Sequence, residues 1–282
     1  MIVPRVAQTT AAVAAHYDDL DRFYREIWGE HLHHGYWTTG RETVEEAVEA
    51  LVDLMAERLQ LAPGLEVCDI GCGYGATAQR LAERWDVGVT GLTVSPVQAE
   101  RARARRPASG RITILEQDWL ANGFADAAFD RAYSVESSEH MPDKQRFFDE
   151  AFRTLKPGGL LAVYAWLARD DPKPWEAAHL LEPICREGRL PGLGDVAEYR
   201  AMAEQSGFSL VSFEDISRRV RRTWSICIQR GLAKLAADPV YRRFVLDGGA
   251  KNRVFALTLF RMMIAFRTGS LRYGLFVYRK PA

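Results

Sequence analysis

A short apolar segment that runs into a glycine-rich turn, residues 67–77, carries the residues best suited to binding a ligand. Gly71, Gly73 and Gly75 lie close together, and Asp69 precedes them at the end of a predicted strand. Glycine is used where the backbone adopts positive φ or comes close to a ligand, so we expect free N–H groups facing one. Asp69 would repel a pyrophosphate and suits a cationic or hydroxyl-bearing ligand. The turn therefore predicts a cradle for a nucleotide-like molecule.

The second predicted strand argues against a dinucleotide. A dinucleotide site places an acidic residue roughly 20 residues beyond the start of the glycine loop, where it holds the ribose. Residues 87–94 read Val-Gly-Val-Thr-Gly-Leu-Thr-Val and contain no acidic residue. The ligand is therefore not expected to be NAD.

The spacing of Asp69 and the three glycines resembles the first motif of class I S-adenosylmethionine (AdoMet) methyltransferases. Residues 90–98 look like the second-strand motif of the sterol, tocopherol and cyclopropane-fatty-acid branch, which often lacks the ribose-binding acid. Asp118 and Trp119 are similar to the pair that contacts adenine, where a carboxylate accepts from the amino group and an aromatic ring covers the base. The resemblance implies AdoMet as cofactor. Its expected binding residues are Asp69, Gly71, Gly73, Gly75, Thr93, Gln98, Asp118, Trp119, Tyr17 and Ser134.

Residues 129–144 resemble the fourth-strand motif of tocopherol-type methyltransferases almost residue for residue, and residues 155–164 resemble the turn into the fifth strand. Glu136, Glu139 and His140 follow a predicted buried strand in the first of these segments. A carboxylate beside an imidazole can share a proton, and burial raises the pKa of a carboxyl group toward the working range. We predict one of the three as catalytic base, His140 first and Glu136 second. An alternative is that they orient the loop or bind the methionine part of the cofactor.

The N-terminal residues 17–37 are rich in aromatic residues and histidine. A similar Trp-Gly-x-x-x-His-His-Gly run folds over the cofactor in tocopherol-type relatives. Tyr17, Tyr36 and Trp37 are therefore expected to line the cofactor and acceptor pocket, where aromatic faces favour a sulfonium cation. The alternative is that they pack the N-terminal helix. No metal is expected, because histidines spaced in this way in a loop cannot all face one ion without a matching acid or cysteine cluster.

Two arginine clusters lead to different expectations. The arginines within residues 101–106 lie on a predicted helix, whose expected environment is a solvated face. Those within residues 218–222 begin a predicted lid, where guanidinium groups can grip an acceptor phosphate. A solvated surface is the competing interpretation there too. The candidate substrate-binding residues are Tyr36, Trp37, Arg218, Arg219 and Trp224.

The scaffold that must position these residues follows from the apolar pattern. Residues 44–59 have helical spacing, preceded by a capping box of Thr43 and Glu46. Strand-like runs lie at residues 65–70, 87–92, 111–115, 129–134 and 159–166. Alternating strands and helices predict a parallel sheet with its ligand at the carboxyl ends of the strands. With the resemblance, the fold class is α/β: a doubly wound, Rossmann-like, seven-stranded, mostly parallel sheet with an N-terminal helical cap and a helical lid insertion.

Five segments are expected along the chain. They are a cap segment at 1–42, an AdoMet-binding Rossmann-like core at 43–166, substrate-side helices and a sixth strand unit at 167–217, a helical lid at 218–268, and a last strand at 269–282. The lid takes the place where a minimal methyltransferase goes straight to its last strand. In the family that the chain resembles, this last strand, here residues 271–278, is antiparallel.

Composition narrows the possible partners. The 282 residues are 48% hydrophobic and 26% charged with a formal net charge of zero, so no global field favours nucleic acid or an anionic membrane. The four cysteines form no Cys-x-x-Cys pair, which favours a reducing compartment without disulfides or zinc. No signal sequence and no spanning apolar run is evident. We expect a cytoplasmic protein, possibly a homo-oligomer, without stable membrane insertion.

The resemblance predicts methyl transfer from AdoMet to a small lipophilic acceptor. Relatives in the sterol and tocopherol branch imply carbon as the accepting atom, in an isoprenoid or a prenylated phenol, with deprotonation by the Glu/His base. The plastid targeting of tocopherol enzymes is missing, which favours a secondary-metabolite enzyme. Two alternatives stay open, since fold does not fix the acceptor: O- or N-methylation of a natural product, and an AdoMet-binding cyclase or other protein that transfers no methyl group.

Overall fold

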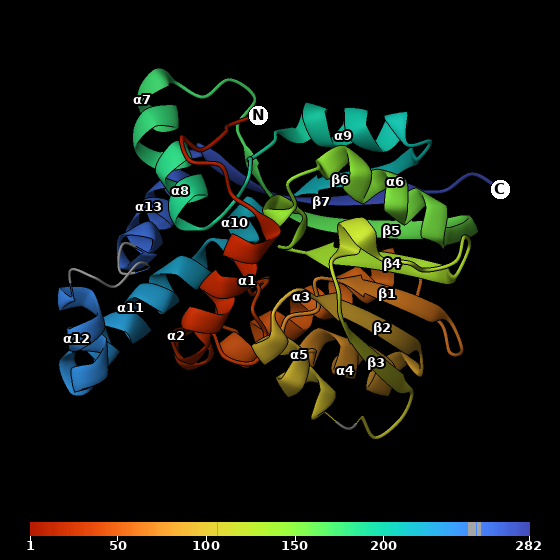
Figure 1. Cartoon of the computed structure of the whole chain (residues 1–282), viewed down its shortest axis with the longest axis horizontal. Helices are drawn as coiled ribbons and strands as arrows, with labels where there is room; N and C mark the ends of the chain where they lie inside the picture. The colour runs from red at the N-terminus through yellow and green to blue at the C-terminus, as the bar shows by residue number, and fades with distance from the viewer. Residues whose placement is uncertain (106, 248–251, 253–254) are drawn as a thin grey trace.

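Seven strands form one sheet at the centre of the computed structural model, which describes residues 1–105, 107–247, 252 and 255–282 (Figure 1). The strand order is β3-β2-β1-β4-β5-β7-β6. The strands are β1 (Glu66–Ile70), β2 (Gly88–Thr93), β3 (Arg111–Glu116), β4 (Phe129–Val135), β5 (Leu155–Ala168), β6 (Ser209–Asp215) and β7 (Leu271–Arg279). The first five pair in parallel, and β7 runs antiparallel to both β5 and β6. The predicted mostly parallel sheet and antiparallel last strand are confirmed.

Helices pack around this sheet. They are α1 (Thr10–Asp19), α2 (Asp21–Ile27), α3 (Val44–Arg58), α4 (Ala76–Trp85), α5 (Pro96–Arg103), α6 (Lys144–Thr154), α7 (Pro174–Glu176), α8 (Glu182–Glu187), α9 (Val196–Gln205), α10 (Ser217–Val220), α11 (Arg222–Ala237), α12 (Pro239–Leu246) and α13 (Phe255–Thr268). A π-helical segment, Ala177–Leu181, joins α7 to α8. The capping box at Thr43 and Glu46 is present at the start of α3, as predicted.

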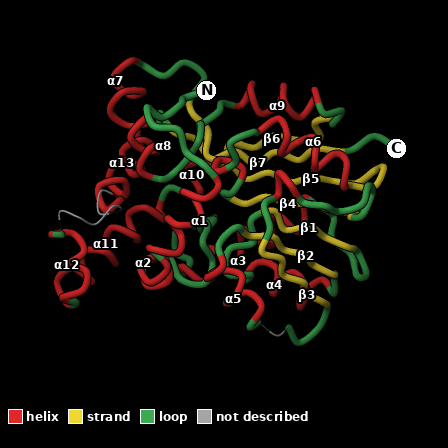
Figure 2. The backbone as a smooth tube through the Cα atoms, viewed as in Figure 1, coloured by secondary structure: helices red, strands yellow, loops and turns green. Residues whose placement is uncertain are grey.

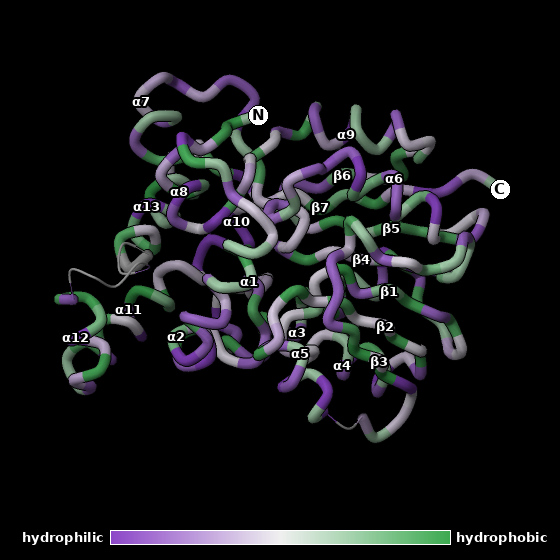
Figure 3. The backbone as a smooth tube through the Cα atoms, viewed as in Figure 1, coloured by the Kyte–Doolittle hydropathy of each residue, from purple (hydrophilic) through white to green (hydrophobic). Residues whose placement is uncertain are grey.

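Both faces of the sheet are buried. Along β5, Leu160, Ala162 and Tyr164 belong to one core, whereas Leu161 and Val163 belong to another. Successive strand residues point to opposite faces, so a strand covered on both sides is apolar throughout. The first core takes in residues of α3, α4, α8, α11 and α13, and the second those of α6 and α9. Figure 3 shows the hydrophobic run along β5 and the alternating colours of the outer helix α9.

Helices from the N-terminal and C-terminal thirds of the chain pack together beside the sheet. The N-terminal helix α2 packs against α11 of the C-terminal third, and α13 packs against α8 and α11. Figure 2 shows this helical layer on one side of the yellow sheet. Residues 248–251, 253 and 254 of the predicted lid, like Arg106, lie outside the described residues. Within the described part of the chain, no helix is long and apolar enough to cross a membrane. The division into cap, core and lid stays a prediction.

Candidate active site

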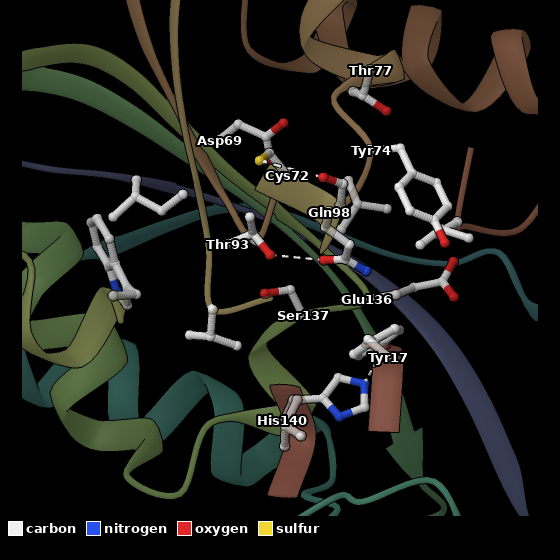
Figure 4. A pocket seen from close by; sticks show the side chains of 18 of the residues that line it. Tyr17, Asp69, Cys72, Tyr74, Thr77, Thr93, Gln98, Glu136, Ser137 and His140 are labelled. Carbon is white, nitrogen blue, oxygen red and sulfur yellow. Dashed lines mark hydrogen bonds between the residues drawn. The ribbon is translucent and has the colours of Figure 1, made fainter. Parts of the chain in front are cut away.

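A cavity lies at the carboxyl ends of β1, β2 and β4, beside α1 (Figure 4). Its empty space, counted together with the solvent at its mouth, is about 990 Å³. The order of the strands reverses between β1 and β4, which is where a doubly wound sheet binds its ligand. The lining comes from α1, the segment after α2, the glycine loop, and the loops after β2, β3 and β4.

The glycine loop borders this cavity in a conformation that needs glycine. Gly71, Gly73 and Gly75 have φ of +91°, +51° and +73°. A β-carbon at Gly71 would collide with the Ser137 side chain. The expectation of free N–H groups is wrong at two positions, because the N–H of Gly71 donates to Leu92 O at 3.0 Å and that of Gly75 to Cys72 O at 2.9 Å. The loop thus contributes to the site mainly because its backbone lies close to the cavity.

Asp69 faces the cavity with an unused acceptor. It is only 2% exposed, and burial raises its pKa to about 7 although Tyr133 beside it acts in the opposite direction. Neither Asp69 Oδ2 nor the Tyr133 hydroxyl makes a hydrogen bond of ordinary geometry within the described chain. A buried carboxylate without donors costs free energy, so the site is suited to a ligand that brings an amino or hydroxyl group.

Thr93, Gln98, Asp118 and Trp119 also line the cavity. Thr93 Oγ1 donates to Gln98 Oε1 at 2.7 Å, which fixes the buried amide (Figure 4). Asp118 accepts from the Thr10 hydroxyl at 3.2 Å, which ties α1 to the loop after β3. The Trp119 indole donates to a main-chain carbonyl at 3.2 Å, so its ring is held in place. The structure brings these predicted cofactor residues together.

Arginines from residues 101–106 anchor the N-terminal segment over the cavity. Arg101 donates to both Asp21 oxygens, at 2.9 and 2.8 Å, and Arg105 donates to Glu30 at 2.5 Å. Arg101 is exposed on α5, as predicted, and in addition forms this ion pair with Asp21, whereas the half-buried Arg105 lies beyond the end of the helix. They hold the segment that contributes Tyr17, among other residues, to the lining.

A second cavity adjoins the first. Its lining includes Trp28, Trp166, Trp224 and Met262. The residues that line both cavities are Tyr17, Leu32, Glu136 and His140. An almost wholly apolar groove between α2, α11, α12 and α13 continues outward, sharing Tyr24 and Trp28 with the second cavity. The predicted substrate residue Trp224 thus lies in a compartment beside the cofactor cavity.

Glu136 lies at the junction in a strained backbone conformation, with φ of +52°. Its Oε1 accepts from the His34 N–H at 2.7 Å and from the Tyr273 hydroxyl at 2.7 Å, and lies 2.9 Å from His34 Nδ1. Burial raises the pKa of Glu136, but the interactions with His34 outweigh burial and leave it below its usual value. A carboxylate stabilised in this way is a weak base. An ionised Glu136 would stabilise a positively charged group beside it.

His140 also lines both cavities, and each of its ring nitrogens has a neighbour within hydrogen-bond distance. Its Nε2 is 3.0 Å from the Tyr17 hydroxyl and its Nδ1 is 3.4 Å from Arg189 O (Figure 4). The carbonyl requires a proton on Nδ1, so Nε2 is the acceptor. Burial lowers the pKa of His140 to about 4, which keeps the imidazole neutral near pH 7. At this pKa His140 is a weak base, as Glu136 is, so geometry rather than basicity favours it: its Nε2 is an acceptor beside Tyr17, and both residues line both cavities.

Two predicted residues lie behind the cavity walls. Glu139 is 1% exposed and lines neither cavity; its Oε1 accepts from the Trp166 N–H at 2.5 Å. Burial raises the pKa of Glu139 to about 7. Ser134 is fully buried, and the residues on either side of it, Tyr133 and Val135, line the cofactor cavity in its place. Strand alternation explains this, since neighbouring residues point to opposite faces.

Four predicted substrate residues lie elsewhere. Tyr36, Trp37, Arg218 and Arg219 are missing from the described lining of both cavities. The chain turns away after Gly35, because the Tyr36 N–H bonds to a carbonyl of α3 at 2.7 Å and the Trp37 N–H to Arg219 O at 3.0 Å. Trp37 then borders a separate, arginine-rich cleft. The sequence could not show this turn.

His34 and Tyr273 are functional residues that sequence reasoning missed. Both bind Glu136, and neither was singled out for that role. Tyr273 reaches the site because β7 pairs with β5 in a register that sets it opposite Trp166. Its only sequence signal was its place in the last strand, since the register of a distant strand is not visible locally.

Comparison with known proteins decides the family. The sequence pattern of the mycolic acid cyclopropane synthetase family matches residues 5–246. The chain belongs to this family. The 27-O-demethylrifamycin SV methyltransferase of Amycolatopsis mediterranei is 34% identical over 275 residues, 94% of this chain and 95% of that protein. The chloroplastic tocopherol O-methyltransferase of Arabidopsis thaliana is 28% identical, over 95% of this chain and 82% of that protein. The solved (4+2)-cyclase SpnF superposes with a TM-score of 0.82 and 27% identity, covering 100% of both chains.

As a member of the cyclopropane synthetase family, the chain is an AdoMet-dependent methyltransferase. The predicted family, enzyme class and cofactor are confirmed. The first cavity fits AdoMet on two observations. Asp69 Oδ2 lacks the donor that an amino or hydroxyl group would supply, and the glycine loop borders the cavity directly at Gly71 and Gly73. Within the described residues, no group of three or more His, Cys, Asp or Glu side chains is arranged to hold a metal ion.

Proposed function

We propose that this enzyme methylates a hydroxyl oxygen of a lipophilic acceptor that enters through the second cavity. The observation that carries the proposal is the junction, where Tyr17, Leu32, Glu136 and His140 line both cavities. Cofactor in one cavity and acceptor in the other would meet there. AdoMet, when bound, supplies the electrophilic methyl group, so this chain's residues have to align the acceptor, exclude water and remove a proton.

His140 would remove that proton. A neutral imidazole near pH 7 can take the hydroxyl proton at Nε2 as the oxygen is methylated, while Arg189 O holds Nδ1–H in place. Tyr17, whose hydroxyl occupies Nε2 here, would yield that position to the acceptor. Glu136 would act electrostatically beside the sulfonium, since its low pKa keeps it ionised. The cofactor itself would be held by Asp69, the glycine loop, Thr93, Gln98, Asp118 and Trp119.

The apolar groove supports a lipophilic acceptor. Aromatic and aliphatic side chains from α2, α11, α12 and α13 line it, and it leads to the inner cavity past Tyr24 and Trp28. Burying apolar surface contributes about 25 cal/mol per Å², so a long hydrocarbon would gain affinity along this path. A polar metabolite would gain nothing there.

We place oxygen ahead of the predicted carbon as the atom that is methylated, because of the names of the relatives. The two curated relatives described above are named for transfer to oxygen. Carbon stays the second candidate, because the family description names cyclopropane formation, which is chemistry at carbon. The same base would serve methyl transfer to oxygen and to carbon, because a carbon that has been methylated must also lose a proton.

Mass spectrometry after incubation with methyl-labelled AdoMet tests the proposal. The acceptor panel consists of lipophilic alcohols, prenylated phenols and prenyl diphosphates, with enzyme-free controls. Label on a hydroxyl oxygen of a lipophilic acceptor is the expected result. Label on carbon would replace the first candidate by the second. Label only on polar acceptors would refute the lipophilic acceptor. No label on any acceptor while AdoMet binds would overturn the proposal and favour a role like that of the cyclase.

Substitution of Gly231 should shorten the accepted substrates. Gly231 of α11 borders the groove, and the nearest atom to an added β-carbon is Ile27 Cδ1 at 4.0 Å. Gly231→Leu fills that space without straining the helix. We expect KM for acceptors long enough to enter the groove to rise about tenfold, as for the loss of one or two methylene contacts. Steady-state kinetics with a homologous series of acceptors measures this.

Gln229→Leu is the matched control, because it adds the same side chain to an exposed position of α11 outside the groove. It should leave KM unchanged for every acceptor. If Gly231→Leu alters short and long acceptors equally, the groove does not hold the acceptor chain.

The rate at saturating AdoMet should persist to unusually low pH. Because the pKa of His140 is lowered to about 4, the acid limb of the rate should lie near pH 4 rather than at the ordinary histidine value of about 6.5. Saturating cofactor removes the titration of Asp69, whose pKa of about 7 would otherwise affect AdoMet binding. Initial rates between pH 4 and 9 give the profile.

Stability has to be followed in the same pH range. Burial lowers the pKa of His16 to about 3 and of His31 to about 2, so below about pH 6.5 the unfolded chain binds more protons and stability falls. Asp69 and Glu139, with raised pKa values, act oppositely: their contribution falls as the pH rises toward about 7. Circular dichroism at each pH identifies the range in which the protein stays folded. An acid limb near 6.5 in folded protein would contradict a buried, neutral His140.

A further inference from the structure

The cleft that Trp37 borders holds five arginines from three segments. They are Arg218, Arg219, Arg221, Arg222 and Arg267, from α10, the start of α11 and the end of α13. Thr38, Thr39 and Ser225 add hydroxyl groups, and no acidic residue is among the lining residues. Within the described chain, none of the five forms an ion pair with a carboxylate. All five are exposed, so water and salt screen their repulsion in part, and an anion between them would lower it further.

Two of the arginines are held in place by the backbone. Arg219 donates to Thr38 O and Arg222 to Gly40 O, and the Arg222 guanidinium lies 5.8 Å from the centre of the Trp37 ring. Each has further N–H groups left over. Fixed guanidinium forks are the geometry that binds phosphate oxygens in pairs.

The neighbouring carboxylate of Glu42 is already occupied. Its Oε1 accepts from the N–H groups of Thr38 and Thr39, at 3.0 and 2.7 Å, and its Oε2 from the Gly40 N–H at 2.9 Å. These bonds lower the pKa of Glu42 and fold the turn that presents Thr38 and Thr39 to the cleft. The nearby acid stays ionised and shapes the cleft, and in the described chain it forms no ion pair with any of the five arginines.

The cleft is separate from the acceptor site. Among the described residues, it shares no lining residue with the cofactor cavity, the acceptor cavity or the apolar groove. Trp224 and Met262 line the acceptor cavity, whereas their chain neighbours Ser225 and Met263 line the cleft. Helices α11 and α13 thus form the wall between them. These arginines line neither the cofactor cavity nor the cavity and groove that we assign to the acceptor, and their predicted grip on an acceptor phosphate stays a prediction.

We propose that this arginine cleft binds a second ligand that bears phosphate groups. Several guanidinium forks beside three hydroxyl groups suit a diphosphate or a larger polyphosphate better than a single carboxylate. The same chemistry is offered by a free diphosphate and by the phosphate headgroup of a lipid. The site does not depend on which atom the enzyme methylates.

Binding of inorganic pyrophosphate to the full chain, measured by isothermal titration calorimetry, tests the proposal. The variant is Arg221→Gln with Arg267→Gln, chosen because neither side chain forms a hydrogen bond or an ion pair within the described protein, so the fold should persist. We expect saturable binding at one site that weakens at least about tenfold in the variant and falls with added salt. Flotation with phosphatidylcholine vesicles, with and without phosphatidylglycerol, forms the second arm.

The control replaces Arg200 of α9 and Arg243 of α12 by glutamine, two exposed arginines outside the cleft. Pyrophosphate binding that only the cleft variant loses supports a free phosphate ligand. Flotation with phosphatidylglycerol that only the cleft variant loses, without pyrophosphate binding, supports a lipid headgroup. Equal binding by both variants, or no binding of either probe by the unchanged protein, overturns the proposal. Circular dichroism and AdoMet binding confirm that each variant is folded.

Discussion

Replacing His140 by glutamine should reduce kcat by about 10² to 10⁴, the usual contribution of a general base. Gln places an oxygen near the position of Nε2 that can still accept from the Tyr17 hydroxyl, now 3.0 Å away, but it cannot take a proton. The junction keeps its shape while the proton acceptor is lost. Affinity for AdoMet, measured calorimetrically, should change less than about threefold, because His140 borders only one end of the cofactor cavity.

Two control variants separate the base from its surroundings. Tyr17→Phe removes the hydroxyl that occupies His140 Nε2 and leaves the imidazole free, so kcat should change by less than about tenfold. Glu136→Gln removes the charge beside the cofactor and should weaken AdoMet binding as well as turnover. If His140→Gln retains full turnover while Glu136→Gln loses it, the carboxylate is the base and the assignment to His140 is wrong.

Local patterns in the sequence were enough to predict the sheet. The runs at 65–70, 87–92, 111–115 and 129–134 each became a strand within a residue or two. The inner strands are apolar because both of their faces are covered, whereas β3 lies at the edge of the sheet and is largely exposed. The run at 159–166 became the longer β5, Leu155–Ala168, because the chain pairs with β4 again at Leu155, before the Lys-Pro-Gly-Gly turn. A register shift separates the two pairings, which an apolar count cannot reveal.

Long-range contacts decided what the sequence could not predict about the site. Trp37 follows the histidine segment by only three residues, yet its N–H bonds to Arg219 O, from a helix nearly two hundred positions later, and it leaves the pocket. We ranked Glu136 above Glu139 as a base, but residue types could not show that Glu136 itself adopts positive φ and lines both cavities while Glu139 accepts from the Trp166 N–H behind them. Such outcomes depend on strand register and on turns with unusual dihedral angles, which residue types alone do not specify.

Replacing Gly71 by alanine should disrupt the cofactor site and destabilise the fold by about 2 to 5 kcal/mol. Part of this cost is backbone strain, because Gly71 has φ of +91°, which side chains other than hydrogen rarely tolerate. The rest is overlap, because the new methyl group would collide with the Ser137 side chain, which itself lines the cavity. Moving either residue shifts the loop against Asp69, so AdoMet affinity should fall by at least about tenfold. Chemical denaturation and calorimetry measure the two effects.

Two further variants separate the cost of backbone strain from the cost of the steric collision. Gly64 has a similar φ of +83° but open space around its β-position, so Gly64→Ala should cost only about 1 to 2 kcal/mol and leave AdoMet affinity unchanged. Adding Ser137→Gly to Gly71→Ala removes the colliding side chain and keeps the backbone strain. Once the effect of Ser137→Gly alone is subtracted, the double variant should be more stable and bind AdoMet more tightly than Gly71→Ala. If Gly71→Ala binds AdoMet as tightly as the unchanged protein, the close approach of this loop is not what holds the cofactor. A double variant as poor as Gly71→Ala would instead assign the whole effect to the dihedral angle.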